Sequence, residues 1–184
     1  MASKKENNKN KKIAPVQLFE KFGEFDSVEE LNEAAAGQLE EGDLDALREL
    51  AEENGIEKED VQDYIDGYTD VMAMPITAAM RRLKVEMEAL KDSAQIRAMC
   101  KFYSEFAISA ATEDEEVARG IMKKGARIKG IYDAIYKYAS KHKEGGCFSG
   151  STTDRQDMEL VKTYYKGGDV NALFKKWFAG EAVK

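Results

Sequence analysis

Residues 43–67 restrict the fold most strongly, because they predict two short helices joined by a tight turn. Asp43 is a good N-cap residue, and leucine and alanine then recur every three or four residues, the spacing of one helix face. Ala51, Gly55 and Val61 supply, in order, a small residue, a glycine suited to a left-handed turn and an inner apolar residue. This order is typical of a helix-turn-helix and predicts a second helix paired with the first.

The predicted second helix carries acidic side chains where a DNA-reading helix carries arginine, lysine, glutamine or serine. Lys58 is its only cation. Its acidic residues are Glu57, Glu59, Asp60, Asp63 and Asp66. Carboxylates repel a phosphate backbone, so we expect a helix pair that does not read DNA through this helix.

Acidic charge is concentrated in one part of the chain. Residues 20–70 contain nineteen acidic and three basic residues, a net charge of −16, whereas the whole chain has a net charge of −7. Residues 1–19 carry five lysines and one glutamate, and residues 71–184 carry twenty basic and fifteen acidic residues. An imbalance of this size costs self-repulsion. Two explanations fit it: a solvated helical face that keeps the protein soluble, or a surface that meets a strongly basic partner.

Helical periodicity continues through the rest of the chain, and no segment shows sustained strand alternation. We therefore predict an all-α multi-helix bundle with an acidic N-terminal three-helix unit that contains the helix-turn-helix-like pair. The expected divisions are a disordered, basic tail at 1–12, an acidic helical unit at 13–70, and a helical domain with a basic segment at 71–184.

Local signals predict where individual helices begin and end. Pro15 suits the first turn of a short helix, which Gly23 would end. Ser27 and Thr112 each begin a capping-box sequence, so a helix is expected to follow each of them.

A long amphipathic helix is expected after Pro75. On it, Arg81, Arg82 and Lys84 are predicted to lie on the polar side. The predicted inner face consists of Ile76, Met80, Leu83, Met87 and Leu90. The next helix is expected to bury Cys100 as an inert thiol, because that residue lies among apolar positions.

The sequence also predicts where the protein resides. No apolar run approaches the roughly 20 residues that span a bilayer. The N-terminus lacks an apolar stretch with a small-residue cleavage site, so it is not a secretory signal. Two cysteines in a chain of this length are too few for a disulfide framework. We expect a cytoplasmic protein with no membrane partner.

Residues that carry catalysis or bind metals are scarce. His142 is the only histidine, and the sequence has no paired cysteine spacing for zinc. His142 could serve as a base for Cys147 or Ser149 as the nucleophile, but this is a weak signal for catalysis, since no third group at a recognisable spacing orients the histidine. No glycine-rich phosphate loop opens a helix. We therefore expect no metal, no cofactor and no enzymatic activity.

Residues 123–143 form a basic segment with interleaved tyrosines, the pattern of a nucleic-acid contact. Its candidate residues are Lys123, Lys124, Arg127, Lys129, Tyr132, Tyr136 and Lys137. The alternative is that this segment is basic because it neutralises the acidic unit within the monomer. The glycine-rich stretch 145–150 after it is expected to be a loop, either a lid or a contact surface.

A longer pattern supports a resemblance. FDSVEELNEAA is followed by EEGDLDALRELAEENGIEKEDVQDYIDG and, after a methionine and proline connector, by MPITAA. Roughly residues 17–140 resemble a family of small acidic proteins encoded on phages, plasmids and conjugative elements of gut Clostridia. Members of this family include anti-CRISPR inhibitors of the type II CRISPR effector nuclease. The segment from Cys147 onward has no counterpart in this pattern.

The resemblance implies binding rather than chemistry, and no catalytic residue is carried over. Type II effectors hold guide RNA and target DNA in channels lined by arginine and lysine. An acidic helical unit that mimics nucleic acid is expected to occupy such a channel and block DNA targeting. The expected contact residues, acting as phosphate substitutes, are Glu52, Glu53, Glu57, Glu59, Asp60, Asp63 and Asp66.

Two other functions remain open at this stage. One is a nucleic-acid-binding accessory protein of a phage or conjugative element that acts through the basic C-terminal helices. The other is an adaptor whose acidic unit binds a different basic protein. The sequence does not specify the oligomeric state.

Overall fold

The computed structural model describes residues 18–143 and 150–178, and within them the predicted all-α class is confirmed. The predicted tail at 1–12 and the predicted loop up to Ser149 lie outside the described residues. The helices are α1 (Val28–Glu41), α2 (Leu44–Glu53), α3 (Lys58–Ile65), α4 (Pro75–Ala89), α5 (Ala94–Glu113), α6 (Glu115–Met122), α7 (Ile128–His142), α8 (Asp154–Tyr165) and α9 (Val170–Phe178).

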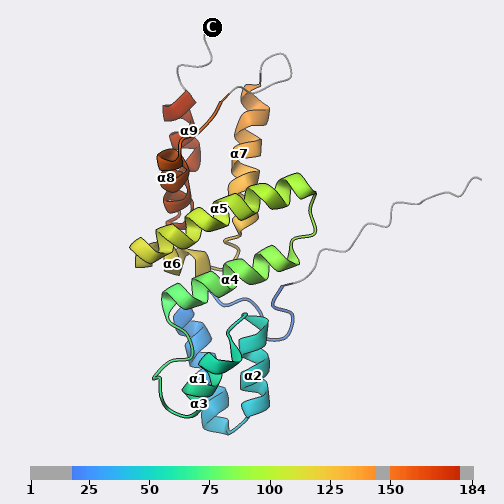
Figure 1. Ribbon diagram of the computed structural model, residues 1–184, viewed down its shortest axis with the longest axis vertical. Coiled ribbons are helices and arrows are strands. Elements are labelled where there is room, and N and C mark those ends of the chain that lie inside the picture. The colour runs from blue at the N-terminus through green and yellow to red at the C-terminus, as the bar shows by residue number, and fades with distance from the viewer. Residues whose placement is uncertain (1–17, 144–149, 179–184) are drawn as a thin grey trace, which may run out of the picture.

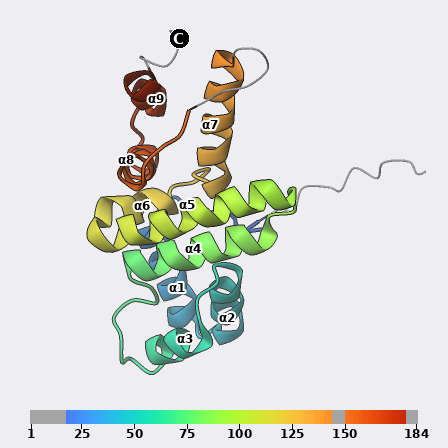
Figure 2. The same ribbon diagram turned by 45° about the horizontal axis from the view of Figure 1, so that its top comes forward.

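The helices enclose two hydrophobic cores, which meet at α4 and α6 (Figures 1 and 2). α1, α2 and α3 lie on one side of the α4–α5 layer, and α7, α8 and α9 lie on the other. The N-terminal core includes the fully buried Leu31, Leu47 and Leu50. Ala78 of α4 and Met122 of α6 also belong to it, although the other buried apolar side chains of these two helices lie in the C-terminal core. The acidic unit is therefore packed directly against the rest of the chain.

Ser27 and Asp43 cap the first two helices as predicted, but the predicted capping box is only half formed, because Glu30 accepts from the Asp26 amide instead of the Ser27 amide. Ser27 Oγ accepts a hydrogen bond from the Glu30 amide at 3.1 Å, and Asp43 Oδ1 accepts one from the Ala46 amide at 3.0 Å. Gly55 has a φ of 72° and lies in the turn between α2 and α3. Both helices lie where the periodicity predicts them. That they act as a helix-turn-helix stays a prediction.

The helix predicted after Pro15 is wrong over its described part, because residues 18–22 are not helical. Phe19 is buried and adopts a φ of 60°, which a helix does not allow. The Arg82 guanidinium lies 4.4 Å from the centre of the Phe19 ring. Residues 18–26, the N-terminal strap, therefore cross α4 as an irregular segment.

The predicted capping box at Thr112 is also wrong. α5 continues through this residue to Glu113, and Thr112 Oγ1 donates to the Ile108 carbonyl at 2.9 Å. Asp114 caps α6 instead, through a hydrogen bond from the Glu116 amide at 3.1 Å. The next helix thus begins two residues later than the sequence pattern predicts.

α4 turns only the C-terminal part of its predicted inner face to the interior. Leu83 is buried as expected, but Ile76 and Met80 are exposed. Arg82, predicted on the polar side, is only 1% exposed, and Glu86 is buried one turn further along. The helix buries these two charged residues because opposite charges meet them inside, as described below.

The connector between α3 and α4 is fixed to α1 by one side chain. Asn32 Nδ2 donates to the Ala73 carbonyl at 2.9 Å, and its Oδ1 accepts from the Ala73 amide at 3.0 Å. Met72 and Ala73 are buried in the N-terminal core. This connector is the long segment that rises beside α1 in Figure 1. Its backbone is therefore held in one position rather than left as a free loop.

Replacing Asn32 with alanine is expected to destabilise the protein by about 2 kcal/mol, because two hydrogen bonds to a buried backbone are lost. Asn32→Asp keeps the acceptor but places a carboxylate oxygen against the Ala73 carbonyl, so a loss of at least the same size is expected. The midpoint of urea unfolding measures both. An Asn32→Ala midpoint equal to that of the wild type would show that this side chain does not hold the connector.

Candidate functional site

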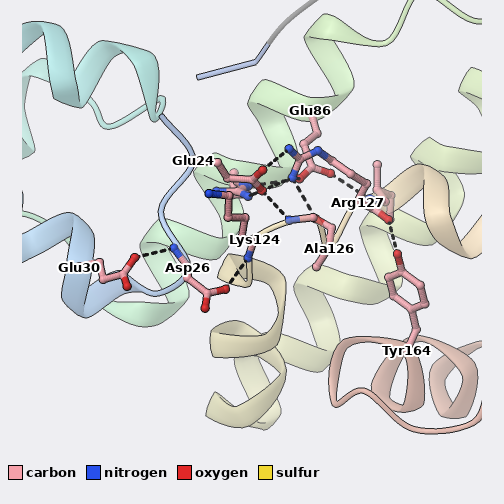
Figure 3. A network of polar contacts seen from close by, with 11 residues as sticks. Glu24, Asp26, Glu30, Glu86, Lys124, Ala126, Arg127 and Tyr164 are labelled. Atoms are coloured by element: carbon pink, nitrogen blue, oxygen red, sulfur yellow. Dashed lines mark hydrogen bonds and ion pairs between the residues drawn. The ribbon is translucent and has the colours of Figure 1, made fainter. Parts of the chain in front are cut away.

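Part of the acidic charge is neutralised at the junction of the N-terminal strap with α4 and the α6–α7 turn (Figure 3). The guanidinium groups of Arg82 and Arg127 both contact the Glu24 carboxylate, and Arg127 Nη2 donates to Glu24 Oε2 at 2.7 Å. The Gly125 amide donates to the same carboxylate at 2.9 Å. On the α4 side, Glu86 accepts from Arg82 Nε at 3.3 Å. We call Glu24, Arg82, Glu86 and Arg127 the junction cluster.

The junction cluster contains two kinds of ion pair: contact favours the charges of Glu24 and Arg127, whereas burial opposes the charges of Arg82 and Glu86. Burial opposes the charge on Glu24, but hydrogen bonds from Arg127 and Gly125 outweigh it, so the pKa of Glu24 lies below its usual value. The same hydrogen bond raises the pKa of Arg127. Burial raises the pKa of Glu86, against the hydrogen bond from the Ile128 amide and the charge of Arg82. Burial lowers the pKa of Arg82, against the charges of Glu24 and Glu86. Each charge in the cluster is therefore compensated by an opposite charge of another member.

Three of the predicted contact residues are engaged within the chain. Arg81 on α4 contacts the Glu57 carboxylate, and its Nη2 lies 3.9 Å from Asp60 Oδ2. Lys84 Nζ lies 3.5 Å from Glu57 Oε1. The Glu53 carboxylate accepts hydrogen bonds from the amides of residues 21 and 22 at 2.7 and 2.9 Å. These carboxylates attach α2 and α3 to the rest of the protein.

The other four predicted residues point outward. Glu52, Glu59, Asp63 and Asp66 are exposed, and none forms an ion pair with a lysine or arginine among the described residues. Asp66 accepts one hydrogen bond, from Gln62 Nε2 at 2.9 Å. Glu59, Asp63 and Asp66 are spaced by four and three residues, so they share one face of α3. We call these three residues the acidic face.

The acidic face belongs to a wider set of unneutralised charges. Eight exposed acidic residues of the 20–70 region make no hydrogen bond or ion pair through their side chains within the described residues. They are Glu20, Glu33, Glu40, Glu41, Glu52, Glu59, Asp63 and Asp70. The charge imbalance of the sequence is therefore reduced by folding but not removed.

The basic segment does not form a single cationic surface. Arg127 is turned into the junction cluster, and Lys129 Nζ pairs with Asp133 at 2.8 Å. The Lys124 amide donates to Asp26 at 2.8 Å. Lys123, Lys124 and Lys137 have exposed side chains. The rings of Tyr132 and Tyr136 stack on each other with centroids 6.0 Å apart.

The residues considered for catalysis show no such arrangement in the part of the chain described. His142 Nδ1 lies 2.9 Å from the Tyr138 carbonyl oxygen, and its ring stacks on the Tyr138 ring. Cys147 and Ser149 lie outside the described residues. Cys100 is buried as predicted, and burial raises the pKa of its thiol to about 11.

Between residues 18 and 178, leaving out 144–149, no group of three or more histidine, cysteine, aspartate or glutamate side chains is placed to hold a metal ion. None of the helices in these ranges combines the length and apolar composition that crossing a membrane requires. No family model, curated protein or solved structure matches this chain.

The junction cluster is the feature that the sequence reasoning missed. One signal was present: Arg82 and Glu86 are four residues apart and would form an ion pair on any helix. Their burial depends on Glu24 and Arg127, which are distant in the sequence. Only the fold brings these four residues together.

Proposed function

We propose that this chain binds a cation-lined groove on another macromolecule through the acidic face of α3 and keeps nucleic acid out of that groove. The observation that carries the proposal is the outward direction of Glu59, Asp63 and Asp66, which have no cationic partner in the described part of the chain. Like charges on one helix face repel each other, so a basic surface that covers them gains energy.

The anchoring of α3 supports a binding role for this face. Glu57 and Asp60 hold α3 to Arg81 of α4, and Val61 and Tyr64 are buried in the N-terminal core. The outward carboxylates are therefore carried by a fixed helix, whose backbone does not need to be ordered on binding. Less conformational entropy is lost when a binding surface is already ordered.

The resemblance of the sequence to anti-CRISPR proteins suggests which partner to test. We propose the type II RNA-guided nuclease with its guide RNA, whose channels for nucleic acid are lined with arginine and lysine. In this role the chain is an inhibitor, a DNA mimic of a mobile element. The alternative, nucleic-acid binding through the basic segment, has less support because Arg127 and Lys129 are paired with the chain's own carboxylates.

Reversing two charges of the acidic face tests the proposal. At low salt, the association rate constant of the Glu59→Lys/Asp63→Lys variant with the guide-loaded nuclease is expected to fall by about tenfold or more, because electrostatic steering is lost. The variant should inhibit DNA cleavage correspondingly less. Stopped-flow association and cleavage assays measure both effects, with circular dichroism to verify that helicity is intact.

A matched control carries the same charge change elsewhere. Glu88 on α4 and Glu105 on α5 are exposed and form no ion pair among the described residues. The Glu88→Lys/Glu105→Lys variant should bind and inhibit like the wild type. If both variants inhibit fully, the acidic face is not the binding site. Retardation of bare duplex DNA by the wild-type chain would instead favour the basic segment.

A further inference from the structure

Exposed apolar side chains are concentrated in the connector between α3 and α4 and in the start of α4. Within the described residues, seven large apolar side chains are exposed, and five of them lie between 68 and 80. They are Tyr68, Val71, Met74, Ile76 and Met80. Tyr68 is 79% exposed and Met74 is 61% exposed. Apolar groups gathered in this way on a soluble protein mark an interaction surface.

The backbone under these side chains is fixed. Asn32 forms hydrogen bonds with both the amide and the carbonyl of Ala73, as described above. Met72 is buried, although Val71 and Met74 near it in the sequence are exposed. The Tyr68 amide donates to the Asp63 carbonyl at 2.8 Å, which closes the end of α3. The apolar surface therefore begins directly where the acidic face ends.

A pocket of about 410 Å³ opens beside this surface, between α1 and the connector. Its apolar lining includes Val28, Val71 and Met74. Three carboxylates and one cation also line it. Glu29 pairs with Arg119, whereas Glu33 and Asp70 have no partner within the described residues. The pocket thus combines an apolar wall with unneutralised negative charge.

We propose that the pocket and the exposed apolar residues around it, together called the connector surface, receive an arginine-bearing apolar segment of the partner protein. The aliphatic stem of arginine matches the apolar wall, and its guanidinium matches the free carboxylates. A nucleic acid does not fit, because its phosphates would face Glu33 and Asp70. Arginine is also enriched among the residues that dominate interface energies.

The inference rests on the proposed function and adds to it the part of the interface that holds the partner after the first encounter. The acidic face acts at long range and sets the association rate. The connector surface excludes water from apolar side chains, and differences of that kind appear mainly in the dissociation rate.

The Tyr68→Ser/Val71→Ser/Met74→Ser variant tests this division. We expect its complex with the guide-loaded nuclease to dissociate at least about tenfold faster, with little change in association rate or in salt dependence. Met74 is the N-cap of α4 and makes no side-chain cap, so serine there suits the helix. The substitution at Met74 should therefore not lower the melting temperature. Phe102→Ser removes an exposed ring from α5 and should leave both rates unchanged.

The outcomes separate the two proposals. If the Glu59→Lys/Asp63→Lys variant binds poorly while the serine variant dissociates like the wild type, the connector surface is not part of the interface and the proposed function stands. If the wild-type chain does not bind the nuclease, the proposed function is wrong and the inference fails with it. A wild-type dimer that the serine variant dissolves, measured by analytical ultracentrifugation, would show a second copy on this surface and overturn the inference.

Discussion

The Gly120→Ala variant is expected to lose about 3 kcal/mol or more of its free energy of unfolding, because the added methyl group has no space. Gly120 lies in α6 where this helix crosses the end of α8. A Cβ atom there would lie 2.7 Å from the Tyr165 carbonyl carbon, and closer still to its oxygen. The obstacle is backbone, which cannot rotate aside as a side chain does, so the two helices must separate.

The separation would disturb the C-terminal core. Leu160 and Val161 of α8 and Ile121 of α6 are buried in that core, and all three would lose contacts. For a chain of this size, such a loss lowers the melting temperature by about 6–12 °C. Differential scanning calorimetry measures it.

Gly37 provides the matched control for this substitution. It lies in the middle of α1, and a Cβ built there meets nothing within 4 Å. Gly37→Ala should therefore stabilise the protein by up to about 1 kcal/mol, because alanine is the better helix former. If Gly120→Ala is as stable as Gly37→Ala, α6 does not approach α8 as closely as described here.

The Arg82→Met variant is expected to lose about 3–5 kcal/mol, the typical cost of removing one member of a buried ion cluster. Arg82 contacts Glu24 and Glu86 and lies over the Phe19 ring. Without it, Glu86 is left buried, with Arg127 Nη1 3.7 Å from its Oε1 as the remaining cation. The N-terminal strap would also lose one of its two guanidinium contacts. Urea unfolding at neutral pH measures the loss.

Two comparisons make this prediction specific. Arg81→Met changes the adjacent residue in the same way, but Arg81 is partly exposed and pairs with Glu57 and Asp60 at the surface. Its loss should cost no more than about 1 kcal/mol. Adding Glu86→Gln to Arg82→Met should restore part of the lost stability, because the buried negative charge is removed. Equal losses for Arg81→Met and Arg82→Met would show that the junction cluster is not buried as described.

Much of the fold follows from local sequence signals. The caps predicted at Ser27 and Asp43 are the observed N-caps of α1 and α2, and the helical periodicity predicts the pairing of α2 with α3 along the chain. These signals act over three or four residues, so they can be recognised without knowledge of the tertiary structure. The all-α class required nothing more.

The errors arise where distant residues decide the outcome. Arg82 was expected on the polar side of α4 because arginine usually faces water, and its burial depends on Glu24, 58 residues earlier. Ile76 and Met80, at the start of the same helix, are exposed although an inner face was predicted there. The strap at 18–26 is irregular because Phe19 is fixed under a guanidinium rather than by helical neighbours.

The candidate site was predictable in part for the same reason. The negative charge of α3 can be counted from the sequence, so Glu59, Asp63 and Asp66 were found. The engagement of Glu57 and Asp60 by Arg81 depends on how α3 packs against α4. The connector surface was missed because Ile76 and Met80 were assigned to the inner face of α4, and the exposure of Tyr68, Val71 and Met74 depends on the tertiary fold.

Competition with DNA tests the central claim most directly. A labelled target duplex is titrated with the guide-loaded, catalytically inactive nuclease at increasing concentrations of this chain, and DNA binding is measured by fluorescence anisotropy. We predict mutual exclusion: the apparent Kd for DNA rises in proportion to the concentration of the chain. A ternary complex that holds both the chain and the DNA, with the affinity for DNA unchanged, would contradict the account.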